Sequence, residues 1–183
     1  MITDPVLLND WHPVARVDHL AETPMLGVRL LGEDLVVWRA GDTYHAWQDL
    51  CIHRGAKLSL GKVTDGCLAC PYHGWLYAED GQCVHMPAHP NQTPPAKARV
   101  KRYRAQERYG LVWACLGEPA NDIPPLPEWG DERYSVAVCG PFRHIQAHGP
   151  RLIENYLDAA HFPFVHEGML GDPAHPEIED FDV

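Results

Sequence analysis

The feature that most restricts the fold is a pair of short loops, C-I-H-R-G at residues 51–55 and C-P-Y-H-G-W at residues 70–75. In each loop a cysteine comes first and a histidine follows within three residues. Strand-like runs bounded by turn residues surround both, so each loop is predicted to form the tip of a β-hairpin. A fold that brings the two tips side by side gathers two thiols and two imidazoles in one place.

Such a set of side chains can bind metal in two ways. Two thiolates on one iron and two imidazoles on the other are the mixed ligation of a Rieske 2Fe-2S cluster, which Cys51, Cys70, His53 and His73 could supply. A zinc ion could use the same atoms, but zinc loops usually take both ligands from like residues, as in C-x2-C. Cys67 does form such a pair with Cys70, which would favour zinc or redox chemistry and leave His73 unused. The alternating residue types favour the cluster.

The loop glycines and the remaining cysteines have simpler expected roles. Gly55 and Gly74 follow the histidines, and we expect their backbone amides to be free to donate hydrogen bonds to the bridging sulfides. Cys83, Cys115 and Cys139 lie in strand-like runs and are expected to be small buried apolar residues.

Composition limits the class of partner and the compartment. The 183 residues suffice for one full domain and part of a second. The formal charge is −10, with six acidic residues among the last 17, which argues against nucleic acid as a ligand. Residues 1–10 lack a signal-peptide pattern and no run of 18 uncharged apolar residues occurs, so a cytoplasmic protein is expected. The six cysteines are then expected to be thiols or metal ligands.

The first two thirds of the chain are predicted to form antiparallel hairpins. A proline-rich, acidic stretch at 118–132 is predicted as a linker, which gives a first domain at 1–117 and a second at 133–183. We therefore expect an all-β domain followed by the beginning of an α+β domain. The predicted elements are strands at 25–31, 35–39, 44–50, 76–78, 82–84, 100–106, 111–116, 134–139 and 142–146, and a helix at 151–162.

The stretch 155–166, N-Y-L-D-A-A-H-F-P-F-V-H, places three ionisable side chains in an apolar run. Burial of such groups without a partner is costly, so Asp158, His161 and His166 need a metal, a hydrogen-bond network or water. If the stretch is helical, Asn155, Asp158 and His161 line one stripe. The solvent-exposed face of an amphipathic helix would then explain these polar residues. Two histidines beside a carboxylate are also how a non-haem iron(II) site begins, so both interpretations stay open.

A proline inside this stretch favours the metal site. Pro163 is expected to disfavour helical geometry at Phe162. The chain would then change direction, and His166 could approach His161 from a new turn rather than from the same stripe.

These motifs resemble those of one family, the oxygenase components of Rieske non-haem iron oxygenases, which include aromatic-ring hydroxylases and O- and N-demethylases. The resemblance lies in C-x-H-R-G and C-x2-H-G-W and returns in N-x2-D-x2-H-x4-H at 155–166. The stretches 81–90 and 107–119 are similar to strand pairs that close the Rieske domain in the demethylase-like branch. The resemblance implies a Rieske 2Fe-2S domain at 1–117 and the start of a catalytic mononuclear-iron domain at 133–183.

The resemblance also implies roles for individual residues. The family's third iron ligand is a carboxylate far downstream, which would lie beyond Val183. The chain is therefore expected to be the N-terminal portion of a longer enzyme and to be inactive alone. The implied cluster ligands are Cys51, His53, Cys70 and His73. The implied ligands of the mononuclear iron are His161 and His166. The implied catalytic residues are Asn155 and Asp158, and Asp158 would link a cluster histidine to an iron histidine.

The implied activity is that of an oxidoreductase of aromatic-compound catabolism. The cluster would accept electrons from an NAD(P)H-dependent reductase, directly or through a ferredoxin, and pass them to the mononuclear iron. The iron would activate O2 for hydroxylation or oxidative demethylation of an aromatic or heteroaromatic compound, in a homotrimer. The alternative is an electron-transfer module without oxygenase activity. A basic run at 97–108 is either a solvated strand face or a docking surface for an acidic electron donor.

Overall fold

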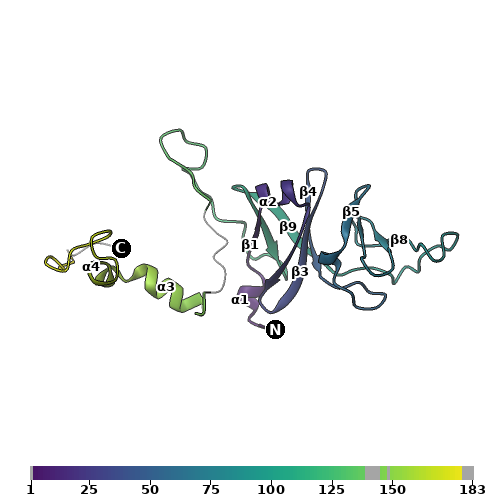
Figure 1. Ribbon diagram of the computed structural model, residues 1–183, viewed down its shortest axis with the longest axis horizontal. Helices are drawn as coiled ribbons and strands as arrows, with labels where there is room; N and C mark the ends of the chain where they lie inside the picture. Colours follow the sequence, from purple (N-terminus) through teal and green to yellow (C-terminus); the bar gives the residue numbers. More distant parts are fainter. Residues whose placement is uncertain (1, 139–144, 148, 179–183) are drawn as a thin grey trace. The chain divides into compact units, whose positions relative to one another are not determined.

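The computed structural model describes residues 2–138, 145–147 and 149–178, which fall into two compact units, Met1–Val136 and Ala137–Val183 (Figure 1). Every strand of the described residues belongs to unit 1. The division lies a few residues beyond the stretch 118–132. The predicted domain limits themselves stay a prediction.

Unit 1 is built on a six-stranded antiparallel sheet in the order β1-β10-β9-β4-β3-β2. The hairpins β2–β3 and β9–β10 turn through Leu31-Gly32 and Tyr109-Gly110, and all four residues have positive φ, as a two-residue type I′ turn requires. These pairings confirm the predicted antiparallel β architecture. The strands are β1 (His12–Arg16), β2 (Met25–Leu30), β3 (Glu33–Ala40), β4 (Thr43–Gln48), β9 (Arg102–Arg108) and β10 (Leu111–Cys115).

A second antiparallel sheet carries the second cysteine–histidine loop. Its strands are β5 (Lys62–Thr64), β6 (Cys67–Ala69), β7 (Leu76–Tyr77) and β8 (Cys83–His85), in that order across the sheet. The second loop connects the paired strands β6 and β7, whereas the first loop lies between β4 and β5, which belong to different sheets. The prediction that each loop is a hairpin tip is therefore confirmed for residues 70–75 and wrong for residues 51–55.

Buried side chains of both sheets, such as Trp38, Trp47 and Tyr77, form one continuous core that includes Cys51 and Cys70. The two loops are therefore anchored in the core. Strands β1, β5 and β6 were not predicted, although Asp65-Gly66, which connects β5 to β6 with positive φ at both residues, is a typical hairpin turn sequence.

Short helices complete both units. They are α1 (Pro5–Leu8), α2 (Val17–Glu22) and the 3-10 turn η1 (Leu58–Leu60) in unit 1, and α3 (Gly149–Leu157), the 3-10 turn η2 (Ala159–His161) and α4 (Phe162–Val165) in unit 2. Among the described residues no helix has the length and apolar character needed to cross a bilayer.

Two predicted strands of the second domain are not confirmed. The prediction at 134–139 is wrong for residues 134–138, which form no strand, and residue 139 lies outside the described residues. Of the strand predicted at 142–146, residues 142–144 lie outside the described residues and residues 145–146 are not in a strand. Strand-like composition produces a strand only where a neighbouring strand pairs with it.

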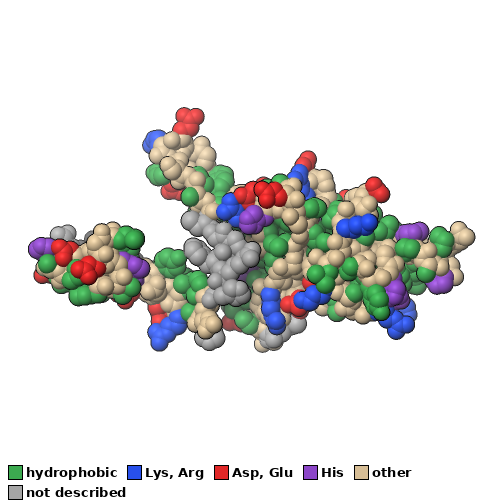
Figure 2. Space-filling model, viewed as in Figure 1, with side chains coloured by type: hydrophobic (Ala, Val, Ile, Leu, Met, Phe, Trp, Pro, Cys, Tyr) green, Lys and Arg blue, Asp and Glu red, His purple; other side chains and the backbone are tan. Residues whose placement is uncertain are grey.

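The surface of unit 2 is rich in apolar side chains, which Figure 2 shows in green. More than half of each of the side chains of Ile153, Tyr156, Leu157, Phe164 and Met169 is exposed. Apolar surface of this kind is typical of elements that pack against another part of a larger protein.

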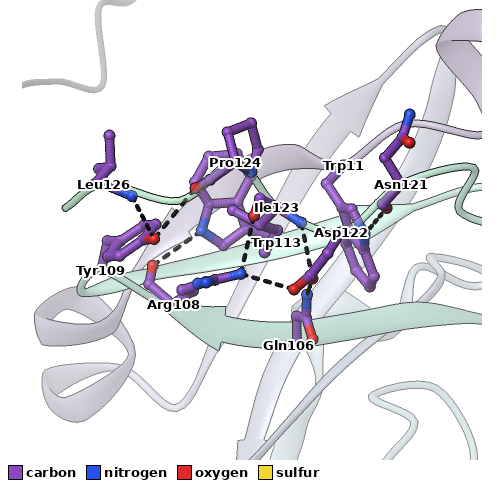
Figure 3. Close-up of polar contacts among 10 residues, drawn as sticks. All are labelled: Trp11, Gln106, Arg108, Tyr109, Trp113, Asn121, Asp122, Ile123, Pro124 and Leu126. Atoms are coloured by element: carbon purple, nitrogen blue, oxygen red, sulfur yellow. Dashed lines mark hydrogen bonds and ion pairs between the residues drawn. The ribbon is translucent and has the colours of Figure 1, made fainter.

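Part of the stretch predicted as a linker is bound to the β9–β10 hairpin of unit 1 (Figure 3). Arg108 Nη1 donates to Asp122 Oδ2 at 2.9 Å. The Tyr109 hydroxyl donates to the carbonyl of Pro124 at 3.2 Å and accepts from the amide of Leu126 at 2.8 Å. The chain therefore leaves the hairpin along a defined path instead of as a free tether.

Candidate metal centres

The first loop is a tight turn that places Cys51 at its base. The Cys51 amide donates to the carbonyl of Ala56 at 2.8 Å, and the Gly55 amide donates back to the carbonyl of Cys51 at 2.8 Å. Gly55 has a φ of +73°, a left-handed conformation that favours glycine. The sequence C-I-H-R-G therefore ends in glycine because the turn needs this conformation.

The second loop repeats this turn at the same offsets. The Cys70 amide donates to the carbonyl of Trp75 at 2.9 Å, and the Gly74 amide donates to the carbonyl of Cys70 at 3.1 Å. Gly74 has a φ of +67°. Because the amides of Gly55 and Gly74 are both used within their turns, the expectation that they are free to reach bridging sulfides is wrong.

Two buried thiols lie together between the loops. Cys51 and Cys70 are almost fully buried and belong to the same core cluster. Burial raises the pKa of the Cys70 thiol, while hydrogen bonds from the amides of Tyr72 and His73 act in the opposite direction. A bound metal would replace the thiol protons, and these two amides would then stabilise the thiolate.

A tyrosine hydroxyl completes the surroundings of the sulfur pair. Tyr77 Oη lies 3.1 Å from Cys51 Sγ, and the Tyr77 side chain is fully buried. Burial, together with the nearby cysteines, raises the pKa of Tyr77, so its hydroxyl keeps its proton. Against a metal-bound thiolate the tyrosine can therefore only donate. Sequence analysis missed this contact, because the two residues are 26 positions apart.

Replacement of Tyr77 by phenylalanine is predicted to lower the reduction potential of a bound cluster. The hydrogen bond to Cys51 favours the state with more negative charge on sulfur, which is the reduced state, so its loss disfavours reduction. The expected shift is on the order of tens of millivolts. A redox titration followed by EPR measures it, and an unchanged or higher potential contradicts the prediction.

The two imidazoles lie beside each other on the same loops. The ring centroids of His53 and His73 are 4.6 Å apart. His53 Nδ1 is buried and has no hydrogen-bond partner among the described residues. Desolvation lowers the pKa of His53, and the charges of His73 and Arg54 lower it further. A buried imidazole nitrogen without a partner fits a metal ligand.

A carboxylate holds the base of the first loop. Asp49 accepts from the Ser59 amide at 2.7 Å and from the Ser59 hydroxyl at 2.6 Å. Asp49 is buried, and the two residues flank the segment that contains Cys51 and His53. Sequence analysis did not identify this pair, because no local spacing rule links an aspartate to a serine ten residues later.

The backbone of unit 2 departs from the single helix predicted at 151–162. Helix α3 ends at Leu157, and Asp158 is extended, with φ −86° and ψ 93°. Its side chain accepts from the Ala160 amide at 2.9 Å and so begins η2. The predicted single stripe of Asn155, Asp158 and His161 is therefore wrong.

The expected effect of Pro163 is also wrong. Phe162 has helical dihedrals, with φ −57° and ψ −48°, and α4 begins there with Pro163 in its first turn. Proline is tolerated at this place because the amide it lacks would have no partner within the helix. The break in the helix comes from Asp158 and not from Pro163.

The structure nevertheless brings the predicted residues of unit 2 together. The ring centroids of His161 and His166 are 5.3 Å apart. His161 Nδ1 is buried and lies 3.6 Å from Asp158 Oδ2, which is too long for a hydrogen bond. Asn155 lies on α3, three residues before Asp158, and is exposed. Within the described residues, no three His, Cys, Asp or Glu side chains are grouped to hold a single ion.

The basic run at 97–108 is partly neutralised by nearby acids. This observation favours its interpretation as a solvated face, because paired cations contribute less to long-range attraction. The ion pairs are Arg99 with Asp80, Arg104 with Glu118 and Arg108 with Asp122.

Comparison with known proteins agrees with this geometry. Residues 10–104 match the family described as the Rieske [2Fe-2S] domain, and residues 145–183 match the vanillate O-demethylase oxygenase C-terminal domain.

Three curated relatives are from bacteria. Methylxanthine N1-demethylase NdmA of Pseudomonas putida is 42% identical over 96% of this chain and 52% of its own length. Oxidoreductase NdmD of the same organism is 37% identical over 63% of this chain and 20% of its own length. The oxygenase component of dicamba O-demethylase from Stenotrophomonas maltophilia is 35% identical over 93% of this chain and 51% of its own length.

A solved structure of NdmA with caffeine aligns with a TM-score of 0.83 at 41% identity, over 93% of this chain and 52% of that one. The chain spans about half the length of the demethylase relatives that it matches. The Rieske match covers more than half of the chain and contains both cysteine–histidine loops. The chain therefore belongs to the Rieske [2Fe-2S] family and corresponds to the N-terminal portion of Rieske non-haem iron oxygenase components.

Proposed function

We propose that the complete protein is the terminal oxygenase of an electron-transfer system and not only an electron carrier. The observation that carries this proposal is the presence of two metal motifs in one chain, the paired loops of unit 1 and the Asp158, His161 and His166 group of unit 2. A carrier needs the first motif and has no use for the second. When bound, the cluster supplies single electrons and the mononuclear iron(II) supplies the site of O2 activation.

The residues of unit 1 would hold the cluster in an asymmetric way. Cys51 and Cys70 would bind one iron from the buried core, where Tyr77 also contacts the sulfur. His53 and His73 would bind the other iron, and His73 is the more exposed of the two. Electrons would enter and leave most readily on the histidine side, because the sulfur side is enclosed by the core.

The residues of unit 2 would hold the mononuclear iron and orient its ligands. His161 and His166 would be two ligands, and a carboxylate beyond Val183 would be the third. Asp158 would hold an imidazole of each centre in place through its carboxylate, with Asn155 beside it on the preceding helix. In a homotrimer these partners would come from neighbouring subunits.

The substrate that we propose is an N-methylated heteroaromatic compound related to the methylxanthines. The support is the likeness to NdmA, a methylxanthine N1-demethylase, over nearly the whole chain. Oxidative demethylation would consume one O2, two electrons and two protons; one oxygen atom would leave in formaldehyde and the other in water. An NAD(P)H-dependent reductase would supply the electrons, and the likeness to oxidoreductase NdmD supports such a partner.

We predict that the full-length protein, given NAD(P)H, a reductase and O2, releases formaldehyde from a methylxanthine, with one NAD(P)H consumed for each formaldehyde. An O-methylated benzoate such as dicamba serves as the comparison substrate and should react more slowly. The measurements are formaldehyde release, NAD(P)H oxidation and O2 uptake. A cluster that is reduced and reoxidised without product from either substrate would favour an electron carrier instead.

A further inference from the structure

Trp75 belongs to the second loop, but its side chain reaches the histidine of the first loop. The indole of Trp75 and the imidazole of His53 are parallel, with an interplanar angle of 5° and ring centroids 4.4 Å apart. The backbone of Trp75 closes its own loop by accepting the Cys70 amide at 2.9 Å. One residue therefore connects both loops, through its carbonyl to one and through its ring to the other.

The stack restricts the rotation of the His53 ring. An imidazole can turn about its bond to Cβ, and this rotation decides where Nδ1 points. A parallel indole face at 4.4 Å leaves room for the ring only in one plane. Trp75 is itself held, because it is partly buried and packs against the core that contains Cys51 and Cys70.

The other ligand histidine has a different neighbour. The ring centroids of Tyr72 and His73 are 3.9 Å apart, but the two rings are tilted by 32° and two thirds of Tyr72 is exposed. Tyr72 also comes from the same loop as His73, so it cannot connect the two loops. The parallel cross-loop stack is therefore specific to His53.

We propose that Trp75 is a positioning residue that holds His53 in its metal-binding orientation and favours the oxidised cluster. This inference rests on the proposed binding of a 2Fe-2S cluster by the loops. The face of an indole ring is electron-rich and attracts positive charge. A metal-bound imidazole carries more positive charge when the cluster is oxidised than when it is reduced, so the indole stabilises the oxidised state.

The test compares Trp75→Leu, which removes the aromatic face, with Trp75→Phe, which keeps one. Trp113→Leu is the matched control, because Trp113 is also partly buried and donates from its indole to the carbonyl of Arg108, away from the loops. Iron and sulfide content, the EPR spectrum of the reduced cluster and the reduction potential are measured on the purified chains before any assay of turnover.

We expect Trp75→Leu to raise the potential. At the wild-type midpoint, the ratio of reduced to oxidised cluster should increase by about threefold to tenfold, which corresponds to roughly 30 to 60 mV for a one-electron couple. The EPR spectrum should also change, because the His53 ring can rotate. Trp75→Phe should restore most of the wild-type potential and spectrum, and Trp113→Leu should change neither.

Each other outcome has a definite meaning. If Trp75→Leu loses the cluster while Trp75→Phe and Trp113→Leu keep it, the aromatic face is needed to hold His53, which supports the proposal. If Trp75→Leu keeps the wild-type potential and spectrum, or if Trp75→Phe also loses the cluster, the proposal is overturned. Absence of a cluster from the wild-type chain would instead refute the proposed function, independently of Trp75.

Discussion

Replacement of Cys51 by serine is expected to leave the purified chain without a 2Fe-2S cluster. Cys51 and Cys70 lie together in the core, and a serine oxygen is a poor substitute for a thiolate on iron. The iron and acid-labile sulfide content should fall by more than about tenfold, since even changes next to metal ligands often cost 10- to 100-fold. Metal analysis and the visible spectrum measure the loss, and His73→Ala should have the same effect.

The matched control is Cys67→Ser, because Cys67 is a half-buried thiol of the neighbouring strand β6. It should keep its iron and sulfide, as should Cys83→Ser and Cys115→Ser. Cys139 lies outside the described residues, and the same result is predicted for its replacement. Loss of metal from Cys67→Ser together with retention in His73→Ala would favour the C-x2-C alternative, and zinc in place of iron and sulfide would contradict the cluster.

The loops could be identified from the sequence because their chemistry is local. Cysteine, histidine and glycine lie within six residues of each other, and the positions of the glycines indicate the turn that each loop forms. The contacts of Tyr77 with Cys51 and of Asp49 with Ser59 could not be found in this way. They depend on which strands become neighbours in the core, and this cannot be determined directly from a single sequence.

The unit 2 predictions show the opposite case, in which local rules compete. Periodicity predicted one helix through residue 162, but the Asp158 carboxylate hydrogen-bonds to a nearby amide and ends the helix. Aspartate is favourable at the N-cap of a helix and unfavourable in its interior, because its side chain hydrogen-bonds to nearby backbone amides. A prediction from hydrophobic periodicity alone does not include this hydrogen bond. The residues Asp158, His161 and His166 still come together, because a short turn also brings them close.

Replacement of Asp158 by asparagine is expected to reduce product formation by the full-length enzyme by about 10- to 100-fold, a typical cost of removing a partner of metal ligands. Asparagine is nearly isosteric and caps a helix as well as aspartate does, so the hydrogen bond to the Ala160 amide can be kept. The change removes the negative charge that lies 3.6 Å from His161 Nδ1. A carboxylate that orients two imidazoles would lose this function while the fold is retained.

The measurement is a single turnover. The cluster is reduced, substrate and O2 are added, and cluster reoxidation is followed together with iron content. Slow reoxidation with both metals present and normal reduction by the reductase supports a bridging role, because only transfer between the centres is then impaired. Loss of the mononuclear iron would make Asp158 a ligand. Unchanged reoxidation would mean that the carboxylate serves only to cap η2, and Asp158→Ala, which cannot cap, would then be the more damaging change.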